Sequence, residues 1–256
     1  MSTKVAIVTG AARGIGRGIA LRLADDGYDL IVNDLDTTET LNLIGGVIAE
    51  VLEKGRRAMR VLGDVSEEAT VASLVNTAVQ QYGRLDVMVA NAGVAPFKPA
   101  LQTTVEEFDR TFQINVRGTF LCYKYAVQQF IEQGEGGRII GASSAAGKEG
   151  NASLSVYSAT KFAIRGLTQS FAKEYGAHKI TVNAYAPGVI DTPAMRAMGE
   201  AMGSMDIFNK IMAEKTAVGY NGSTDDVASL VSFLVSKEAH FITGQTISVD
   251  GGWQLS

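Results

Sequence analysis

A glycine-rich turn between a short apolar strand and a helix most restricts how this chain can fold. The predicted strand is Val5-Ala6-Ile7-Val8, the turn is Thr9-Gly10-Ala11-Ala12-Arg13-Gly14-Ile15-Gly16, and a helical spacing of apolar residues begins at Ile19. Glycines here allow a tight turn and close approach to a phosphate, while the helix N-terminus offers free N–H groups to an anion. The order therefore predicts a dinucleotide-binding unit of an α/β fold, with a plain strand-turn-helix connection as the alternative.

A second predicted strand, Leu30-Ile31-Val32-Asn33-Asp34, ends in an acid 18 residues after Gly16. An acid at this spacing accepts hydrogen bonds from an adenosine ribose and repels a 2′-phosphate, which favours NAD over NADP. Arg13 argues the other way, because a cation in the glycine loop could receive that phosphate. Leu35 follows Asp34, so no basic neighbour in sequence neutralises the carboxylate, and we expect NAD.

Tyr157 and Lys161 lie four residues apart in a run, 155–175, whose apolar residues have helical spacing. On a helix such residues share a face, so the phenol and the ammonium project to the same side. A free tyrosine titrates near pH 10, and a nearby positive charge lowers that pKa. Tyr157 is therefore a candidate general acid or base, although an isolated Tyr-x-x-x-Lys pair often arises by chance.

Two more polar residues are candidates for the same chemistry. A predicted strand leads into Ser143-Ser144, and the Ser144 hydroxyl, thirteen residues before Tyr157, could donate to a substrate carbonyl oxygen. Asn115 falls inside a long predicted helix, 105–131, where its amide competes for backbone groups. Either it is a satisfied interhelical amide, or it marks a local kink that holds water in a proton path.

Two further segments follow predicted strands. In Gly63-Asp64-Val65-Ser66, Asp64 would lie beside an adenine in a doubly wound sheet, and Ser66 is expected to cap helix 67–82. Asn91-Ala92-Gly93 follows a buried strand, where the glycine suggests a backbone that passes close to a ligand. A simple turn is the alternative for Asn91.

The composition excludes several classes of protein. The chain has 256 residues, enough for one large domain (1–256), and 23 Lys+Arg against 27 Asp+Glu with no basic block. Neither nucleic acid nor an anionic membrane is therefore an expected partner. Cys122 is the single cysteine and is expected in the core, while His178 and His240 lack metal spacing, so no metal is expected. The strand at residues 5–8 leaves no room for a signal peptide, and we expect a cytoplasmic protein.

In their order along the chain, these motifs resemble the short-chain dehydrogenase/reductase family. The matching segments are the glycine turn at residues 9–16, Asn91-Ala92-Gly93, Asn115, Ser144, Tyr157-Ser158-Ala159-Thr160-Lys161, Pro187-Gly188 and Asp250-Gly251-Gly252. The resemblance implies a single Rossmann-like, doubly wound α/β domain with a seven-stranded parallel sheet, helices on both faces, and usually a homotetramer.

The resemblance also implies roles for particular residues. Tyr157 would be the acid/base, Ser144 would orient the carbonyl, and Asn115 would anchor a water relay. Lys161 would bind nicotinamide-ribose hydroxyls and depress the Tyr157 pKa. The Ile190 backbone and the Thr192 hydroxyl would hold the nicotinamide carboxamide. The cofactor-binding residues it implies are Gly10, Arg13, Gly14, Ile15, Gly16, Asp34, Asp64, Val65, Asn91, Ala92, Gly93, Tyr157, Lys161, Pro187, Gly188, Ile190 and Thr192.

Residues 150–157 and 161–169 are similar to a narrower group, the acetoin (diacetyl) reductases or 2,3-butanediol dehydrogenases. The chain departs from that group at Ala145, where a polar Gln is expected, and Asn151 could substitute for it. The resemblance implies NAD-dependent interconversion of a small ketone, vicinal diketone or acyloin and the secondary alcohol. Alternatives are a sugar alcohol, an aryl ketone, a 3-oxoacyl thioester, or a non-catalytic nucleotide-binding protein. Expected substrate contacts are Ser144, Ala145, Asn151, Tyr157, Gly188 and Met195.

Segment 193–220 is the expected substrate-binding lid. Met195, Met198, Met202 and Met205 are spaced three, four and three residues apart, which predicts one face of a helix. The helix could pack on the core, or it could form an adaptable apolar lid, since methionine fills irregular gaps. Trp253 is expected at a subunit contact or at the rim of the site.

Overall fold

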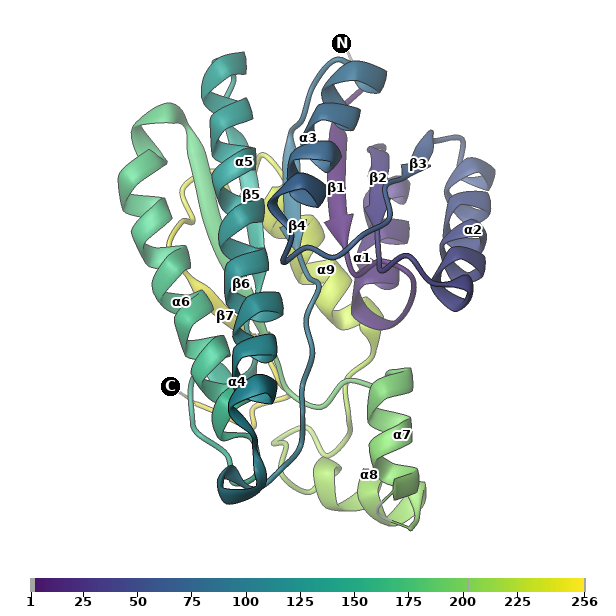
Figure 1. Ribbon diagram of the computed structural model, residues 1–256, viewed down its shortest axis with the longest axis vertical. Helices are drawn as coiled ribbons and strands as arrows, with labels where there is room; N and C mark the ends of the chain where they lie inside the picture. The colour runs from purple at the N-terminus through teal and green to yellow at the C-terminus, as the bar shows by residue number, and fades with distance from the viewer. Residues whose placement is uncertain (1–2, 202, 256) are drawn as a thin grey trace.

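A single seven-stranded parallel sheet forms the framework of the computed structural model, which describes residues 3–201 and 203–255 (Figure 1). The strand order is β3-β2-β1-β4-β5-β6-β7, and it reverses between β1 and β4, as the doubly wound fold requires. The predicted fold class is confirmed. The strands are β1 Val5–Thr9, β2 Asp29–Asn33, β3 Ala58–Arg60, β4 Val87–Ala90, β5 Gly137–Ala142, β6 Ile180–Pro187 and β7 Thr246–Val249.

Helices cover both faces of the sheet (Figure 1). One core contains apolar side chains of α1, α2 and α9, and the other contains those of α3, α5 and α6. Along β1, Ala6 and Val8 enter the first core while Val5 and Ile7 enter the second, because successive side chains point to opposite faces. The helices are α1 Gly14–Asp25, α2 Thr38–Glu53, α3 Glu68–Tyr82, α4 Val105–Phe112, α5 Gly118–Gln133, α6 Ser155–Tyr175, α7 Pro193–Ala201, α8 Met205–Ala213 and α9 Thr224–Val235.

The long helix predicted over 105–131 is present but interrupted. Thr104 and Glu107 form a capping box at its start, and α4 then passes into a π-helical turn, Gln113–Arg117, before α5 begins. Asn115 lies in this turn, so the helix is distorted where one of the two interpretations placed a kink. Single π turns inside α-helices occur frequently at functional sites.

Ser66 does not cap the following helix as predicted. The N-cap of α3 is Glu67, whose side chain makes no capping bond. The backbone N–H of Ser66 instead donates to Asp64 Oδ1 at 2.8 Å, and its hydroxyl accepts from Arg110 at 3.2 Å. The prediction failed because Arg110, 44 residues away on α4, engages the hydroxyl.

The methionine-rich segment forms two helices rather than one. α7 contains Met195 and α8 begins at Met205, so the predicted continuous helical face is wrong. Met202 and the side chain of Met198 lie outside the described residues. Both helices lie near the end of the sheet toward which the β1 arrow points (Figure 1).

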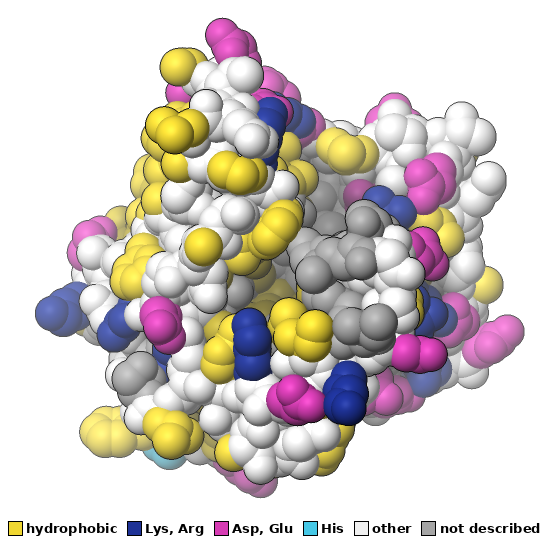
Figure 2. All heavy atoms as spheres, turned by 90° about the horizontal axis from the view of Figure 1, so that it is seen from below, with side chains coloured by type: hydrophobic (Ala, Val, Ile, Leu, Met, Phe, Trp, Pro, Cys, Tyr) yellow, Lys and Arg dark blue, Asp and Glu magenta, His cyan; other side chains and the backbone are white. Residues whose placement is uncertain are grey.

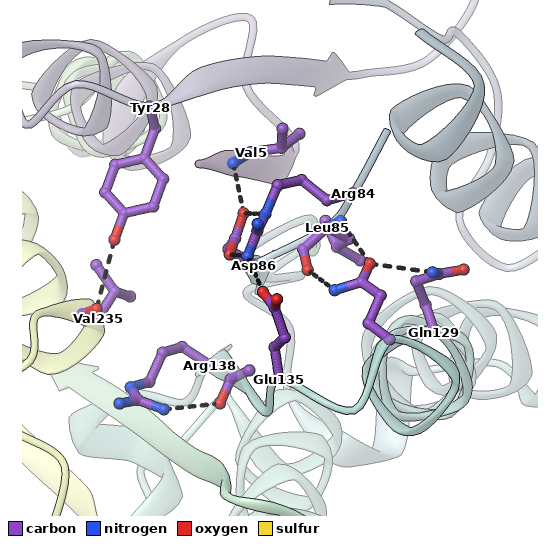
Figure 3. Close-up of polar contacts among 11 residues, drawn as sticks. Val5, Tyr28, Arg84, Leu85, Asp86, Gln129, Glu135, Arg138 and Val235 are labelled. Atoms are coloured by element: carbon purple, nitrogen blue, oxygen red, sulfur yellow. Dashed lines mark hydrogen bonds and ion pairs between the residues drawn. The ribbon is translucent and has the colours of Figure 1, made fainter. Parts of the chain in front are cut away.

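Paired polar groups lie at the other end of the sheet, where the central strands β1, β4 and β5 begin (Figure 3). Asp86, just before β4, accepts from the Val5 backbone at 2.8 Å and from Arg84 at 2.7 and 2.9 Å. Arg84 also binds Glu135 at 2.7 Å. Cys122 is buried in the core as expected. Within residues 3–201 and 203–255, no helix is long and apolar enough to cross a membrane.

Candidate active site

A cleft of about 400 Å³ opens where the carboxyl ends of the central strands meet. Its walls include Asp34 after β2, the glycine loop after β1, Asn91 after β4, and Tyr157 with Lys161 beside β5. Figure 2 views this end of the molecule and shows a hollow bordered by hydrophobic side chains. β2 and β5 are three strand positions apart, so the ends of these two strands lie roughly 14 Å apart across the sheet. This location is where open α/β sheets bind ligands.

The glycine loop combines backbone angles that favour glycine with close contacts that leave no room for a Cβ at Gly16. Gly10 and Gly14 have φ of 63° and 57°, in the left-handed region that favours glycine. Gly16 lies in the first turn of α1, where an added Cβ would lie 2.1 Å from Gly10 O. Backbone N–H groups are thereby kept open toward the cleft, and the loop fits the phosphates of a dinucleotide.

Asp34 favours NAD and Arg13 could favour NADP, and the structure gives each side chain hydrogen-bonded partners that bear on this choice. The Asp34 carboxylate accepts from the Ala12 N–H at 3.0 Å and from the Leu35 N–H at 2.9 Å. Arg13 is paired with Glu39 of α2 at 2.9 Å. The cation that could receive a 2′-phosphate therefore already has a carboxylate partner. Glu39 was not identified from the sequence, since nothing along the chain pairs it with Arg13.

Asp64 and Val65 line the cleft as predicted. Burial raises the pKa of Asp64, but hydrogen bonds from Arg110 and Ser66 outweigh this and hold the pKa below its ordinary value. Asp64 is therefore an ionised anchor for α4 at the cleft wall.

Tyr157 and Lys161 project from one face of α6 into the cleft, as the spacing predicted. Lys161 Nζ lies 5.4 Å from the centroid of the Tyr157 ring. The ammonium donates to the Ala142 carbonyl at 2.6 Å, and the residue is only 5% exposed. The pair thus occupies the end of the cleft at β5.

Lys161 does not bring the pKa of Tyr157 below its ordinary value in this structure, so the predicted depression is not seen as a net effect. Burial raises the Tyr157 pKa, and a hydrogen bond from Ser144 only partly opposes this. Burial also lowers the pKa of Lys161 to about 8. The reason is that removal from water disfavours both charged forms, while the ammonium is directed to the Ala142 carbonyl. Tyr157 is therefore held in the protonated, proton-donating form.

Ser144 brings a second hydroxyl to Tyr157. It follows β5 and starts a short 3₁₀ turn, where its Oγ accepts from the Ala146 N–H at 3.1 Å. That contact leaves the hydroxyl proton free to be donated toward Tyr157. Two adjacent hydroxyl donors can stabilise negative charge that develops on a carbonyl oxygen.

Asn115 is fully buried and holds other parts of the site in place. Its Oδ1 accepts from the Val94 N–H at 2.8 Å, and its Nδ2 donates to Val94 O at 2.8 Å and to Thr160 Oγ1 at 3.0 Å. Thr160 in turn donates to the Tyr157 carbonyl at 2.7 Å. The amide of Asn115 is therefore satisfied, as the first interpretation expected, and its helix is distorted, while the water relay stays a prediction.

Several predicted contacts lie away from the cleft wall. Pro187 and Thr192 line it, but Gly188 packs against Asp250 and Ile190 is buried in the core. Ala145 is also buried, Asn151 donates to Glu149 O at 3.2 Å, and the Met195 N–H donates to Thr192 Oγ1 at 3.3 Å.

Across the described part of the chain, no three His, Cys, Asp or Glu side chains gather as a metal site.

Tyr185 is a cleft residue that the sequence analysis missed. It lies in β6, lines the cleft, and donates its hydroxyl to Asn91 Oδ1 at 2.7 Å. A signal was available, because it is a tyrosine near the carboxyl end of an apolar strand, where a buried phenol needs a polar partner.

Comparison with known proteins assigns the family. The family profile described as "Enoyl-(Acyl carrier protein) reductase" matches residues 10–254. A short-chain dehydrogenase/reductase from Armillaria gallica is 49% identical over 97% of this chain and 95% of its own. The chain belongs to the short-chain dehydrogenase/reductase family. A diacetyl reductase [(S)-acetoin forming] from Staphylococcus epidermidis is 42% identical, covering 98% of each chain. The crystal structure of an acetoin dehydrogenase from Salmonella typhimurium matches with a TM-score of 0.87 and 36% identity, covering 99% of this chain and 97% of that one.

As a short-chain dehydrogenase/reductase, the protein is a nicotinamide-dependent oxidoreductase that acts on CH–OH groups. The predicted enzyme class is confirmed, and so is the resemblance to the acetoin reductase group. Its substrate is a small molecule.

Proposed function

We propose that this short-chain dehydrogenase/reductase uses NADH to reduce a vicinal diketone or acyloin to the secondary alcohol, and catalyses the reverse oxidation with NAD. The observation that carries this proposal is the hydrogen-bonded pair of Ser144 and Tyr157 beside Lys161, at the opposite end of the cleft from Asp34. The similarity to a diacetyl reductase and to an acetoin dehydrogenase supports the substrate class.

When bound in the cleft, the nicotinamide supplies or accepts the hydride. In reduction, Tyr157 Oη donates its proton to the carbonyl oxygen as negative charge develops there, and the Ser144 hydroxyl donates a hydrogen bond to the same oxygen. The raised pKa of Tyr157 keeps this proton in place at neutral pH. Lys161 stabilises the phenolate that remains, and Asn115 positions the turn of α6 that carries Tyr157.

The cleft residues fit NAD better than NADP. The Asp34 carboxylate lies at the adenosine end, where it accepts from ribose hydroxyls and repels a 2′-phosphate. Arg13 is neutralised by Glu39. The glycine loop would hold the pyrophosphate, Asp64 and Val65 would flank the adenine, and Asn91-Ala92-Gly93 would pass beneath the dinucleotide. Gly188 and Ile190 would contribute through their backbones beside Pro187 and Thr192.

A second candidate substrate is a bulkier monoketone. The observation that favours it is Ala145, which is 4% exposed and offers no polar atom for the second oxygen of a diketone. The Asn151 amide, proposed as the substitute, donates to its own loop at Glu149 O. A non-catalytic nucleotide-binding protein is not favoured, because Tyr157 and Lys161 both face the cleft.

Segment 193–220 is proposed as the substrate-binding lid of a single domain that spans the chain. Helices α7 and α8 lie at the carboxyl end of the sheet (Figure 1), and Thr192, immediately before α7, lines the cleft. The half-buried side chains of Met195, Met205 and Met212 supply apolar surface without fixed charge. Such a lid suits a small uncharged ketone.

We also propose a homotetramer in the cytoplasm. A groove of about 520 Å³ is lined mainly by α4 and the π-helical turn, with one residue each from α5 and α6, and its apolar lining residues are Phe112, Val116, Phe120 and Leu167. Phe108, Phe120 and Phe162 are each about two-fifths exposed, which is unusual for aromatic side chains on a monomer. A second copy of the chain would cover this surface. Light scattering after size exclusion is expected to give four chain masses, and Phe120→Asp should lower that number.

Initial rates of NADH and NADPH oxidation with diacetyl, acetoin, a cyclic ketone, an aryl ketone and a ketose test the proposed function. Fast NADH turnover with diacetyl is the expected result. Preference for the cyclic or aryl ketone would replace the diketone by the second candidate. An absence of turnover with every carbonyl would contradict both.

A further inference from the structure

The cleft contains a second tyrosine, Tyr185, that the proposed chemistry does not use. It lies in β6, is 1% exposed, and reaches across the end of the sheet to Asn91, 94 residues earlier. Its hydroxyl and Asn91 Oδ1 are 2.7 Å apart, a short hydrogen bond between two side chains.

The surroundings of the Asn91 amide decide which group donates. Asn91 Nδ2 donates to two backbone carbonyls of the glycine loop, Thr9 O at 2.8 Å and Gly10 O at 3.1 Å. A flipped amide would place its oxygen against these two acceptors, so Oδ1 must face Tyr185. Tyr185 is therefore the donor. Burial raises the Tyr185 pKa, so its proton stays in place throughout the working pH range.

The same amide is wedged into the glycine loop. A Cβ added at Gly10 would lie 2.9 Å from Asn91 Nδ2, and one added at Gly16 would lie 2.5 Å from it. The Thr9 hydroxyl oxygen also accepts from the Asn91 and Ala92 N–H groups, each at 3.0 Å. The amide cannot rotate without moving the backbone of the loop.

We propose that Tyr185 is a positioning residue for the dinucleotide: its hydroxyl fixes the Asn91 amide, and the amide holds the glycine loop in its binding conformation. This inference rests on the proposed binding of a nicotinamide dinucleotide in the cleft. Tyr185 links β6, β4 and β1 in one chain of hydrogen bonds without contacting the reacting atoms. Phenylalanine would fill the same space but would leave Asn91 Oδ1 buried without a donor.

The test is Tyr185→Phe, with NADH affinity measured by fluorescence titration in the absence of any ketone. Loss of the hydroxyl leaves Asn91 Oδ1 buried without a donor, and the amide can relieve this only by moving the backbone of the glycine loop. The dissociation constant for NADH is therefore expected to rise about tenfold. The KM for NADH should rise in parallel, while kcat at saturating NADH changes less than about twofold, because Tyr157 and Ser144 are untouched.

Tyr123→Phe is the matched control. Tyr123 is also fully buried and donates or accepts one side-chain hydrogen bond, to Thr168 Oγ1 at 3.0 Å, but it lies in the core on the other face of the sheet. Its loss should reduce stability to urea as much as Tyr185→Phe does, and it should leave NADH affinity unchanged.

A double-mutant cycle separates positioning from general packing. Asn91→Ala should weaken NADH binding, and Tyr185→Phe should add no further loss in that background, because both act through one amide. Wild-type affinity in Tyr185→Phe, or full additivity with Asn91→Ala, would overturn the inference while the proposed function stands. A wild-type protein that binds neither NADH nor NADPH would overturn the proposed function itself.

Discussion

Adding one methyl group to the glycine loop should weaken cofactor binding strongly without unfolding the protein. In Gly16→Ala the new Cβ would lie 2.1 Å from Gly10 O and 2.5 Å from Asn91 Nδ2. Real Cβ contacts are essentially never shorter than 3.0 Å, so the loop backbone must move by about 1 Å. Gly46→Ala is the matched control, because Gly46 lies in α2 with nothing within 4 Å of its added Cβ.

The expected changes in the free energy of unfolding have opposite signs in the two variants, and only Gly16→Ala is expected to lose NADH affinity. Misplacing a binding group by about 1 Å can lower function about 100-fold, so the NADH dissociation constant of Gly16→Ala should rise by that factor, or about 2.7 kcal/mol. Overpacking should reduce its free energy of unfolding by about 1–3 kcal/mol, partly offset by the helix propensity of alanine. Gly46→Ala should instead gain about 0.5–1 kcal/mol of stability and bind NADH normally.

Fluorescence titration with NADH and urea unfolding, done on both variants, give the two quantities. NADH affinity within threefold of wild type in Gly16→Ala would refute the interpretation of this loop as the dinucleotide cradle. Loss of binding in Gly46→Ala as well would show that the assay reports helix perturbation instead.

Two further predictions concern charge. Glu39→Gln should raise kcat/KM for NADPH by about 1.4- to fivefold and leave kcat/KM for NADH unchanged, because an exposed ion pair stabilises by about 0.2–1 kcal/mol and its loss frees Arg13 for a 2′-phosphate. Unchanged NADPH kinetics would show that Arg13 does not face that phosphate. Since the Lys161 pKa is lowered to about 8, kcat/KM for NADH should fall as pH rises through about 8 and the ammonium deprotonates, whereas Lys161→Arg should remove that fall. The same shift makes stability rise with pH between about 8 and 10.5, where the unfolded chain alone keeps the proton on Lys161, so urea midpoints that fall across this window would contradict it.

Local patterns predicted most of the fold. The periodicity of residues 155–175 matches α6, and the helix predicted to begin at residue 105 does begin there, behind a capping box at Thr104. These features depend on neighbours within four residues, so the sequence contains them directly. The family resemblance then implied a seven-stranded parallel sheet, which the structure contains.

The errors involve contacts between residues distant in sequence. Ser66 was expected to cap α3, but Arg110 takes its hydroxyl. The partner of Arg13 lies on α2, and that of Tyr185 lies after β4. The Tyr157 pKa rises because the folded chain buries the phenol, which spacing to Lys161 alone could not reveal. In each case a tertiary contact or burial decided the outcome.

The most direct measurement of the central claim compares turnover and cofactor binding in Tyr157→Phe. The assay uses NADH with the ketone that wild type reduces fastest, and the NADH dissociation constant is measured on the same preparation. Removing the proton donor should lower kcat by about 10²–10⁴-fold and leave the dissociation constant within about threefold, because the glycine loop and Asp34 are unchanged. Turnover within threefold of wild type would show that Tyr157 is not the general acid.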